Sequence, residues 1–293
     1  MILEARALEF AYTPGRPVLQ GISFALDKGE LAFLLGPNGG GKSTLIECLC
    51  GLKKPARGKV LLGGRPVHEL PLRARARFLS YVPQVHEPPF AYSVWQVVLM
   101  GRAPYLSLLG RPGREDHAAA CAALEAVGLG EASDRPYTTL SGGERRLVLI
   151  ARSLAQEAEF MLLDEPDAHL DPAHQHLVLS VLKELAREGK GVLASSHSPN
   201  NALLYGDRSL LLAEGKALAL GRPREVLTPG LLTAAYGIPF RLVQGPDGEA
   251  ALLPVVPQSE RSAESPATES ESGAGRESSR SSWARASAAA KGA

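Results

Sequence analysis

A glycine-rich segment that joins an apolar run to a helical pattern constrains the fold of this chain most. It runs Gly-Pro-Asn-Gly-Gly-Gly-Lys-Ser from Gly36 to Ser43, directly after the apolar run Leu31–Leu35. Glycines let the backbone curl so that its N–H groups point at phosphate oxygens, and the following helix adds the positive end of its dipole. In this pattern a lysine reaches the β- and γ-phosphates and a hydroxyl binds Mg²⁺. The residues predicted to bind a nucleotide here are Gly36, Pro37, Asn38, Gly39, Gly40, Gly41, Lys42, Ser43 and Thr44, with Ser43 also a predicted Mg²⁺ ligand.

The surrounding pattern predicts an α/β fold. Residues 2–12 and 22–30 alternate apolar and polar positions, which predicts two half-buried strands joined by a turn at 13–17. The apolar runs Phe160–Leu163 and Val192–Ser196 are typical of buried parallel strands.

The domain organisation follows from changes in pattern along the chain. Helical periodicity at 94–100 and 117–127, punctuated by glycine and proline, predicts a helical subdomain inserted at about 86–157 in a domain spanning 1–240. We expect a short C-terminal extension at 241–257. Residues 258–293 are rich in Ser, Ala, Glu and Arg, and we predict a disordered tail because they offer little apolar surface to bury.

Composition excludes several classes of partner and site. The net charge is +1, so no strong field favours nucleic acid, and none is expected as a partner. Three cysteines are too few for a disulfide framework, and Cys48 and Cys50 are interpreted as small apolar residues. No run reaches about 18 apolar residues, so we expect any link to a membrane to come through another chain.

Two carboxylates end the apolar run Phe160–Leu163. Adjacent residues of a strand point to opposite sides, so Asp164 and Glu165 can take different roles. Downstream of a phosphate loop, we expect Asp164 to bind Mg²⁺ and Glu165 to act as general base toward the attacking water.

A second glycine pair follows a serine at Ser141, Gly142 and Gly143, which we call the signature segment. Ser141 and Glu144, three residues apart, form a predicted capping box at the start of a helix. Glycines at a helix N-terminus leave backbone N–H groups open to an anion. An ordinary capped helix is the alternative interpretation.

These segments together resemble the ABC ATPase family over about residues 2–255. The resemblance implies that the signature segment of one subunit contacts the γ-phosphate held by the phosphate loop of another, in a homodimer with composite ATP sites. It implies that Tyr12 stacks on adenine, that Gln84 senses Mg²⁺ and couples to a membrane partner, and that His197 contacts the γ-phosphate. The implied fold is a P-loop NTPase core of ABC ATPase type, with an N-terminal antiparallel β subdomain and an inserted helical subdomain. Lys42, Glu165 and His197 are the expected catalytic residues, with ATP and Mg²⁺ as cofactors.

The chain departs from the family pattern at three positions. Asp167 stands where Thr or Ser is commoner, Ser198 where Asp is usual, and Arg146 where Gln is frequent. None of these changes removes a group expected to touch phosphate, metal or water. His169, His174 and His176 also suggest a metal site, although the resemblance instead places His169 at the dimer interface.

Three further segments resemble the importer branch for iron–siderophore complexes, haem and vitamin B12, namely 101–105, 164–171, and 221–227 followed by Tyr236-Gly237. This implies a peripheral subunit on the cytoplasmic face of the cell membrane, which powers a separate permease served by a substrate-binding protein. A zinc/manganese or molybdate importer is the nearest alternative. A DNA-repair ABC ATPase would carry a long coiled coil between the two glycine segments, and a translation factor would carry two ATPase domains. Neither feature is present in this sequence.

Overall fold

The computed structural model describes residues 1–84, 91–107, 109–246 and 248–255, and its central element is a mixed sheet. The strands of this core sheet are β3 (Leu31–Leu35), β6 (Leu79–Val82), β7 (Phe160–Leu163), β8 (Gly191–Ser196), β9 (Arg208–Ala213) and β10 (Lys216–Gly221). Their spatial order is β10-β9-β3-β8-β7-β6. All neighbours pair in parallel except β10, which is antiparallel to β9. The predicted buried parallel strands are confirmed.

A second, antiparallel sheet is built mainly from the N-terminal part of the chain. Its strands, in the order β2-β1-β4-β5, are β1 (Ile2–Thr13), β2 (Arg16–Asp27), β4 (Arg57–Leu62) and β5 (Arg65–Pro66). The turn between β1 and β2 is shorter than the predicted 13–17, because Thr13 already pairs with Arg16. Pro17 can enter β2 because β2 is an edge strand, where a residue without an N–H breaks no ladder.

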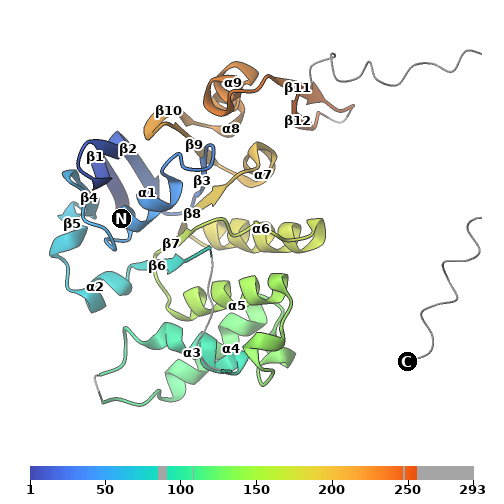
Figure 1. The fold of residues 1–293 in the computed structure, drawn as a ribbon. Coiled ribbons are helices and arrows are strands. Elements are labelled where there is room, and N and C mark those ends of the chain that lie inside the picture. Colours follow the sequence, from blue (N-terminus) through green and yellow to red (C-terminus); the bar gives the residue numbers. More distant parts are fainter. Residues whose placement is uncertain (85–90, 108, 247, 256–293) are drawn as a thin grey trace, which may run out of the picture. The chain divides into compact units, whose positions relative to one another are not determined.

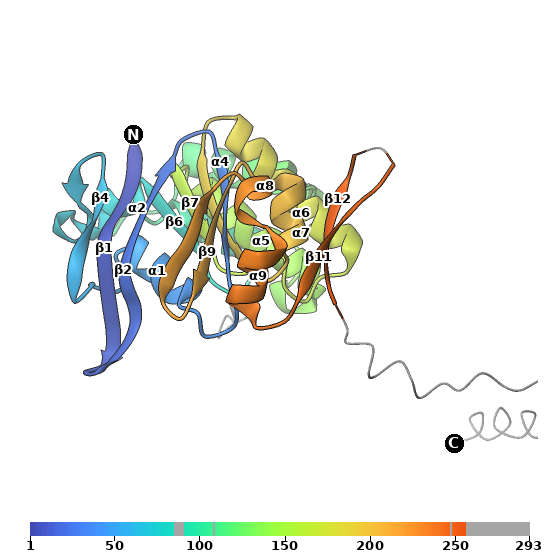
Figure 2. The same cartoon turned by 90° about the horizontal axis from the view of Figure 1, so that it is seen from above.

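Helices pack against the core sheet, and one of them lies between this sheet and the second one (Figure 2). They are α1 (Lys42–Leu49), α2 (Leu72–Ala76), α3 (Val94–Leu99), α4 (Arg114–Ala126), α5 (Gly142–Ala155), α6 (Pro172–Arg187), α7 (Pro199–Tyr205), α8 (Pro223–Val226) and α9 (Pro229–Tyr236). Figure 2 shows α1 between the strands β1 and β2 on one side and β9 on the other. Among the residues that the structure describes, no helix combines the length and the apolar character needed to cross a bilayer.

The alternation of β3 explains why the described part of the chain forms two apolar clusters. Leu31, Phe33 and Leu35 join a cluster with residues of α3 to α7, whereas Ala32 and Leu34 join a cluster with α1 and the antiparallel sheet. Cys48 and Cys50 lie in the second cluster, where burial raises the pKa of Cys48 to about 11 and that of Cys50 further. Their interpretation as apolar packing residues fits this environment.

The helices α3, α4 and α5 lie together next to the β6 and β7 side of the core sheet, as Figure 1 shows. Arg102, which follows α3, is buried and ties this group together. It donates to Asp116 of α4 at 2.9 Å and to the carbonyl of Ala155 of α5 at 2.8 Å, and it lies 4.0 Å from the centre of the Tyr105 ring. The segment 101–105 therefore helps to pack α3, α4 and α5 together.

The predicted domain boundaries stay predictions, and the observed elements can be located within them. The predicted helical subdomain, about 86–157, contains α3, α4 and α5, and its residues 86–90 lie outside the described part. The predicted extension, 241–257, contains most of a hairpin of β11 (Phe240–Gln244) and β12 (Ala250–Pro254), which Asn200 of α7 bonds through both backbone groups of Leu252. The predicted disordered tail, 258–293, lies outside the described residues.

The start of α5 packs against the first turn of α6 at a glycine. A Cβ atom on Gly143 would lie 2.5 Å from Cδ2 of His174, whereas a Cβ on Gly142 would meet nothing within 4 Å. The imidazole of His174 is held in place by Asp171, whose Oδ2 lies 2.5 Å from Nδ1. The two neighbouring glycines therefore differ in their tolerance of a side chain.

This contact predicts that Gly143→Ala destabilises the folded subunit by about 1–3 kcal/mol through overpacking. Gly142→Ala is the matched control, and it should stay within about 0.5 kcal/mol of the wild type. Chemical denaturation without nucleotide measures both. Adding His174→Ala to Gly143→Ala should recover part of the loss. Equal stability of the two alanine variants would contradict this packing.

Candidate functional site

The carboxyl ends of four parallel strands meet at one edge of the core sheet. Leu35 of β3 pairs with Ser196 of β8, and Leu163 of β7 pairs with Ala194 of β8 and with Val82 of β6. The segments that follow these strands therefore converge, as open α/β sheets require of their ligand sites. A cleft of about 750 Å³ lies there, lined by Tyr12, Val18, Asn38, Gly39, Gly41, Lys42, Ser43, Thr44, Gln84, Glu165, Ala168, His169 and His197.

The predicted phosphate loop forms the floor of this cleft and begins at a glycine that no other residue could replace. Gly36 has φ +147°, and a Cβ there would overlap the carbonyl oxygen of Leu212 in β9. The Lys42 ammonium donates to the carbonyls of Gly36 and Pro37 at 2.9 and 3.1 Å. Burial lowers the pKa of Lys42, and the negative charges of Glu165 and Asp164 oppose that shift.

The two predicted acidic residues follow β7, and one hydroxyl of β8 bonds the side chain of the first and the backbone of the second. Ser195 Oγ donates to Asp164 Oδ1 at 2.7 Å and accepts from the Glu165 N–H at 2.8 Å. Both acids are buried. Glu165 has φ +49°, a left-handed conformation that residues other than glycine seldom adopt and that is concentrated at functional sites. Ser195 therefore contacts the carboxylate of Asp164 but only the backbone of Glu165.

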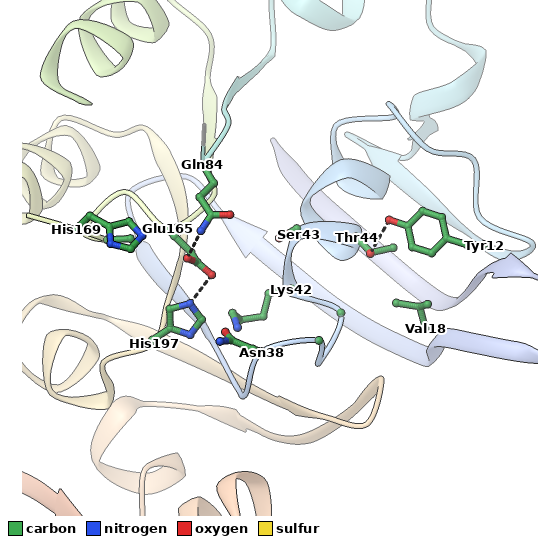
Figure 3. A pocket seen from close by; sticks show the side chains of 13 residues that line it. Tyr12, Val18, Asn38, Lys42, Ser43, Thr44, Gln84, Glu165, His169 and His197 are labelled. Atoms are coloured by element: carbon green, nitrogen blue, oxygen red, sulfur yellow. Dashed lines mark hydrogen bonds and ion pairs between the residues drawn. The ribbon is translucent and has the colours of Figure 1, made fainter. Parts of the chain in front are cut away.

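Both carboxylate oxygens of Glu165 contact side chains that follow other strands, as Figure 3 shows. Gln84, just beyond β6, donates from Nε2 to Oε2 at 2.6 Å. His197, just beyond β8, places Nε2 2.5 Å from Oε1. One cluster beside Lys42 therefore brings together three predicted site residues from separate parts of the sequence, Gln84, His197 and Glu165.

Tyr12 lies at the far end of the cleft, and its side chain is 61% exposed. Its hydroxyl lies 3.2 Å from Thr44 Oγ1 and accepts from Lys53 Nζ at 2.7 Å. Lys53 in turn forms a 2.9 Å ion pair with Glu47. Lys53 Nζ also lies 4.3 Å from the centre of the Tyr12 ring, so the exposed ring is oriented from the α1 side.

The signature segment does not line this cleft. Ser141 caps α5 by accepting from the Glu144 N–H at 3.2 Å, and Glu144 Oε2 accepts from the Ser141 N–H at 2.8 Å, which confirms the predicted capping box. Ser141 and Gly142 are exposed. The segment is thus a capped helix start that lies outside the phosphate-loop cleft.

Two of the three departures from the family pattern have structural partners outside the cleft. Asp167 is buried, and its Oδ2 accepts from Ser196 Oγ and from Asn201 Nδ2, each at 2.6 Å. Ser198 caps α7, with its hydroxyl accepting from the Asn201 N–H at 3.3 Å. The two residues therefore stabilise the connection between β7, β8 and α7.

The three histidines after β7 do not converge. His169 lines the cleft, His174 bonds Asp171, and His176 Nδ1 lies 2.6 Å from the hydroxyl of Tyr205. Within the described ranges, no group of three or more His, Cys, Asp or Glu residues is placed to hold a metal ion. This arrangement gives the histidine metal-site interpretation no support.

Sequence reasoning missed several residues of the cleft and its support. Val18, Ala168 and Lys53 carry no signal, because an apolar strand residue, an alanine and a surface lysine are common everywhere. Ser195 had a weak signal, since a serine in a fully buried strand needs a hydrogen-bond partner.

Comparisons with known proteins agree with this fold. The family model for the ABC transporter matches residues 19–168. The hemin import ATP-binding protein HmuV of Myxococcus xanthus is 40% identical over 260 residues, which cover 86% of this chain and 96% of that protein.

Solved structures give the same result. A metal-chelate type ABC transporter in an inward-facing conformation has a TM-score of 0.77 and 34% identity, covering 87% of this chain and 97% of that one. A bacterial ABC transporter cassette solved as a dimer has a TM-score of 0.67 and 26% identity, covering 76% and 99%. The predicted fold class is confirmed, and the chain belongs to the ABC transporter family as an ATP-binding subunit with ATPase activity.

Proposed function

We propose that this chain is the ATPase subunit of an importer for haem or a closely related metal chelate. The catalytic part of this proposal rests on one observation: Gln84 and His197 contact the two carboxylate oxygens of Glu165 in the phosphate-loop cleft. The cargo is supported by relatives such as the Myxococcus xanthus protein, which are named for hemin import. These names favour haem over the zinc/manganese or molybdate alternative.

The residues of the cleft divide into binding and reacting groups. The backbone of the phosphate loop and Lys42 bind the β- and γ-phosphates of ATP, and Tyr12 stacks on the adenine. Glu165 accepts a proton from the attacking water, and its position is set by Gln84 and His197. His197 also lines the cleft, which supports a contact with the γ-phosphate.

The donor set near Lys42 fits Mg²⁺. The Ser43 hydroxyl, the Asp164 carboxylate and the amide oxygen of Gln84 are hard oxygen ligands, which this ion prefers. A bound Mg²⁺ would neutralise charge on the phosphate oxygens. Asp164 is held by Ser195, so its free oxygen has a fixed direction.

We further propose that the working unit is a head-to-tail homodimer. Ser141 and Gly142 of the signature segment are exposed, and the segment lies outside the phosphate-loop cleft of its own chain, which leaves it available to a nucleotide in the cleft of a second copy. The similar cassette solved as a dimer supports this arrangement. A membrane permease would hold the dimer at the cytoplasmic face, and a substrate-binding protein would deliver the cargo.

We predict that Glu165→Gln retains ATP binding but lowers kcat at least about a hundredfold, because the amide cannot accept a proton from water. The variant should accumulate as an ATP-bound dimer, visible by size-exclusion chromatography. Phosphate release measures kcat. Glu188→Gln, the same change on an exposed residue after α6, is the matched control. Hydrolysis by Glu165→Gln at the rate of this control would refute the assigned base.

The composite site predicts complementation between two inactive variants. Ser141→Arg blocks the signature segment, and Lys42→Ala removes the ammonium group of the phosphate loop. Each homodimer should therefore be inactive. A mixed dimer holds one site with both parts intact, and an equal mixture should recover up to about a quarter of the wild-type rate. Measured activity that stays at the level of the separate variants would contradict the head-to-tail arrangement.

The cargo is tested by uptake in cells that lack the chain. Re-expression of the wild type should restore uptake of labelled haem, whereas Glu165→Gln, expressed at the same level, should not. Ferric siderophore, cobalamin, Zn²⁺ and molybdate are measured in parallel. Restoration confined to Zn²⁺ or molybdate would overturn the haem proposal and leave the ATPase assignment intact.

A further inference from the structure

Arg146 joins the signature helix to the segment that carries Gln84. It lies on α5 about one helical turn after the signature segment, and it is only 8% exposed. Its Nη1 donates to the carbonyl of Pro83 at 2.9 Å, and its Nη2 donates to the carbonyl of Gln84 at 2.9 Å. One guanidinium therefore holds two consecutive peptide units beyond β6.

This contact restrains both position and orientation. A guanidinium is planar and rigid, so two parallel hydrogen bonds fix the acceptors more firmly than one donor on a flexible stem. Burial strengthens the restraint, because removal of the donors would leave partly buried carbonyl groups without these partners.

The restraint continues from the backbone of Gln84 to the proposed base. The Gln84 side chain donates to Glu165 Oε2 at 2.6 Å, and His197 contacts the other oxygen. A shift of the α5 start would therefore move Gln84 relative to Glu165, because α5 is a continuous helix between the signature segment and Arg146.

Charges near Arg146 favour its location at this junction. Burial lowers the pKa of Arg146, and Tyr137, Asp167, Asp164 and Glu165 oppose that shift. A guanidinium stays protonated in proteins, so the group remains a cation beside the acids of the cleft.

We propose that Arg146 is a positioning residue that couples the signature segment to Gln84 and, through Gln84, to Glu165. The inference rests on the proposed head-to-tail dimer, in which the signature segment faces the nucleotide of the partner and Glu165 faces the nucleotide of its own subunit. Arg146 then transmits the state of one ATP site to the base of the other. Its effect on hydrolysis passes through the Gln84 side chain.

Glutamine, which the family resemblance leads one to expect at this position, is the informative substitution. Its side chain is shorter and ends in one amide group, so it cannot supply the two-nitrogen fork that reaches the carbonyls of Pro83 and Gln84. Lysine keeps the charge but donates from a single point. The two variants therefore separate the geometry of the fork from its charge.

A double-mutant cycle on the full-length dimer tests the coupling. Arg146→Gln should lower kcat about tenfold through misplacement of Gln84 and bring the Hill coefficient for ATP toward one. The affinity of the subunit for a fluorescent ATP analogue should change less than about twofold. In a Gln84→Ala background, Arg146→Gln should change kcat less than about twofold, because the side chain it positions is gone.

Two further variants complete the design. Arg146→Lys should give an intermediate kcat, and it carries the same cycle if Arg146→Gln lowers the melting temperature too far for assay. Arg145→Gln is the matched control, since Arg145 is a neighbour on α5 that donates to the Thr138 carbonyl instead, and it should keep the wild-type Hill coefficient.

The outcomes separate this inference from the proposed function. An equal fold-loss in both backgrounds would show a merely structural role and overturn the coupling, as would wild-type kinetics in Arg146→Gln. A wild-type dimer with a Hill coefficient of one would also overturn it while leaving the ATPase assignment in place. A wild-type dimer that does not hydrolyse ATP would overturn the proposed function itself.

Discussion

The parallel pairing of β3, β8, β7 and β6 is the constraint on which the site depends. Parallel neighbours bring their carboxyl ends to one edge, so the phosphate loop and the residues after the other three strands meet without help from long loops. The register matters as much as the direction, since Ser195 of β8 must lie beside the end of β7 to hold both acids. The apolar cores on both faces of the sheet fix that register.

Much of the fold and of the nucleotide site could be predicted from the sequence because both have strong local signals. The run Leu31–Leu35 and the phosphate loop that follows it form a strand and a loop whose positions match the prediction. The strand Phe160–Leu163 ends at Asp164, as predicted. The capping box at Ser141 was readable because its two partners lie three residues apart. In each case the interaction and the pattern occupy the same short stretch.

The rest could not be predicted, because it consists of contacts between residues far apart in the chain. No local pattern states that Gln84 and His197 bind the same carboxylate, or that Arg146 donates to the segment after β6. The strand β2 was predicted to start too late because Pro17 has the local character of a turn residue, and only the edge position of β2 makes it acceptable. Resemblance to the family supplied residues such as Gln84 that pattern alone could not.

The left-handed backbone conformation of Glu165 has a consequence for which substitutions this position can accept. Asparagine, aspartate and glycine enter that conformation most easily, but none carries a carboxylate at the length of glutamate. Almost no residue type therefore both suits this backbone conformation and offers an acid that reaches Gln84 and His197. Replacement by glycine or asparagine would relieve the backbone strain but remove the carboxylate that contacts Gln84 and His197.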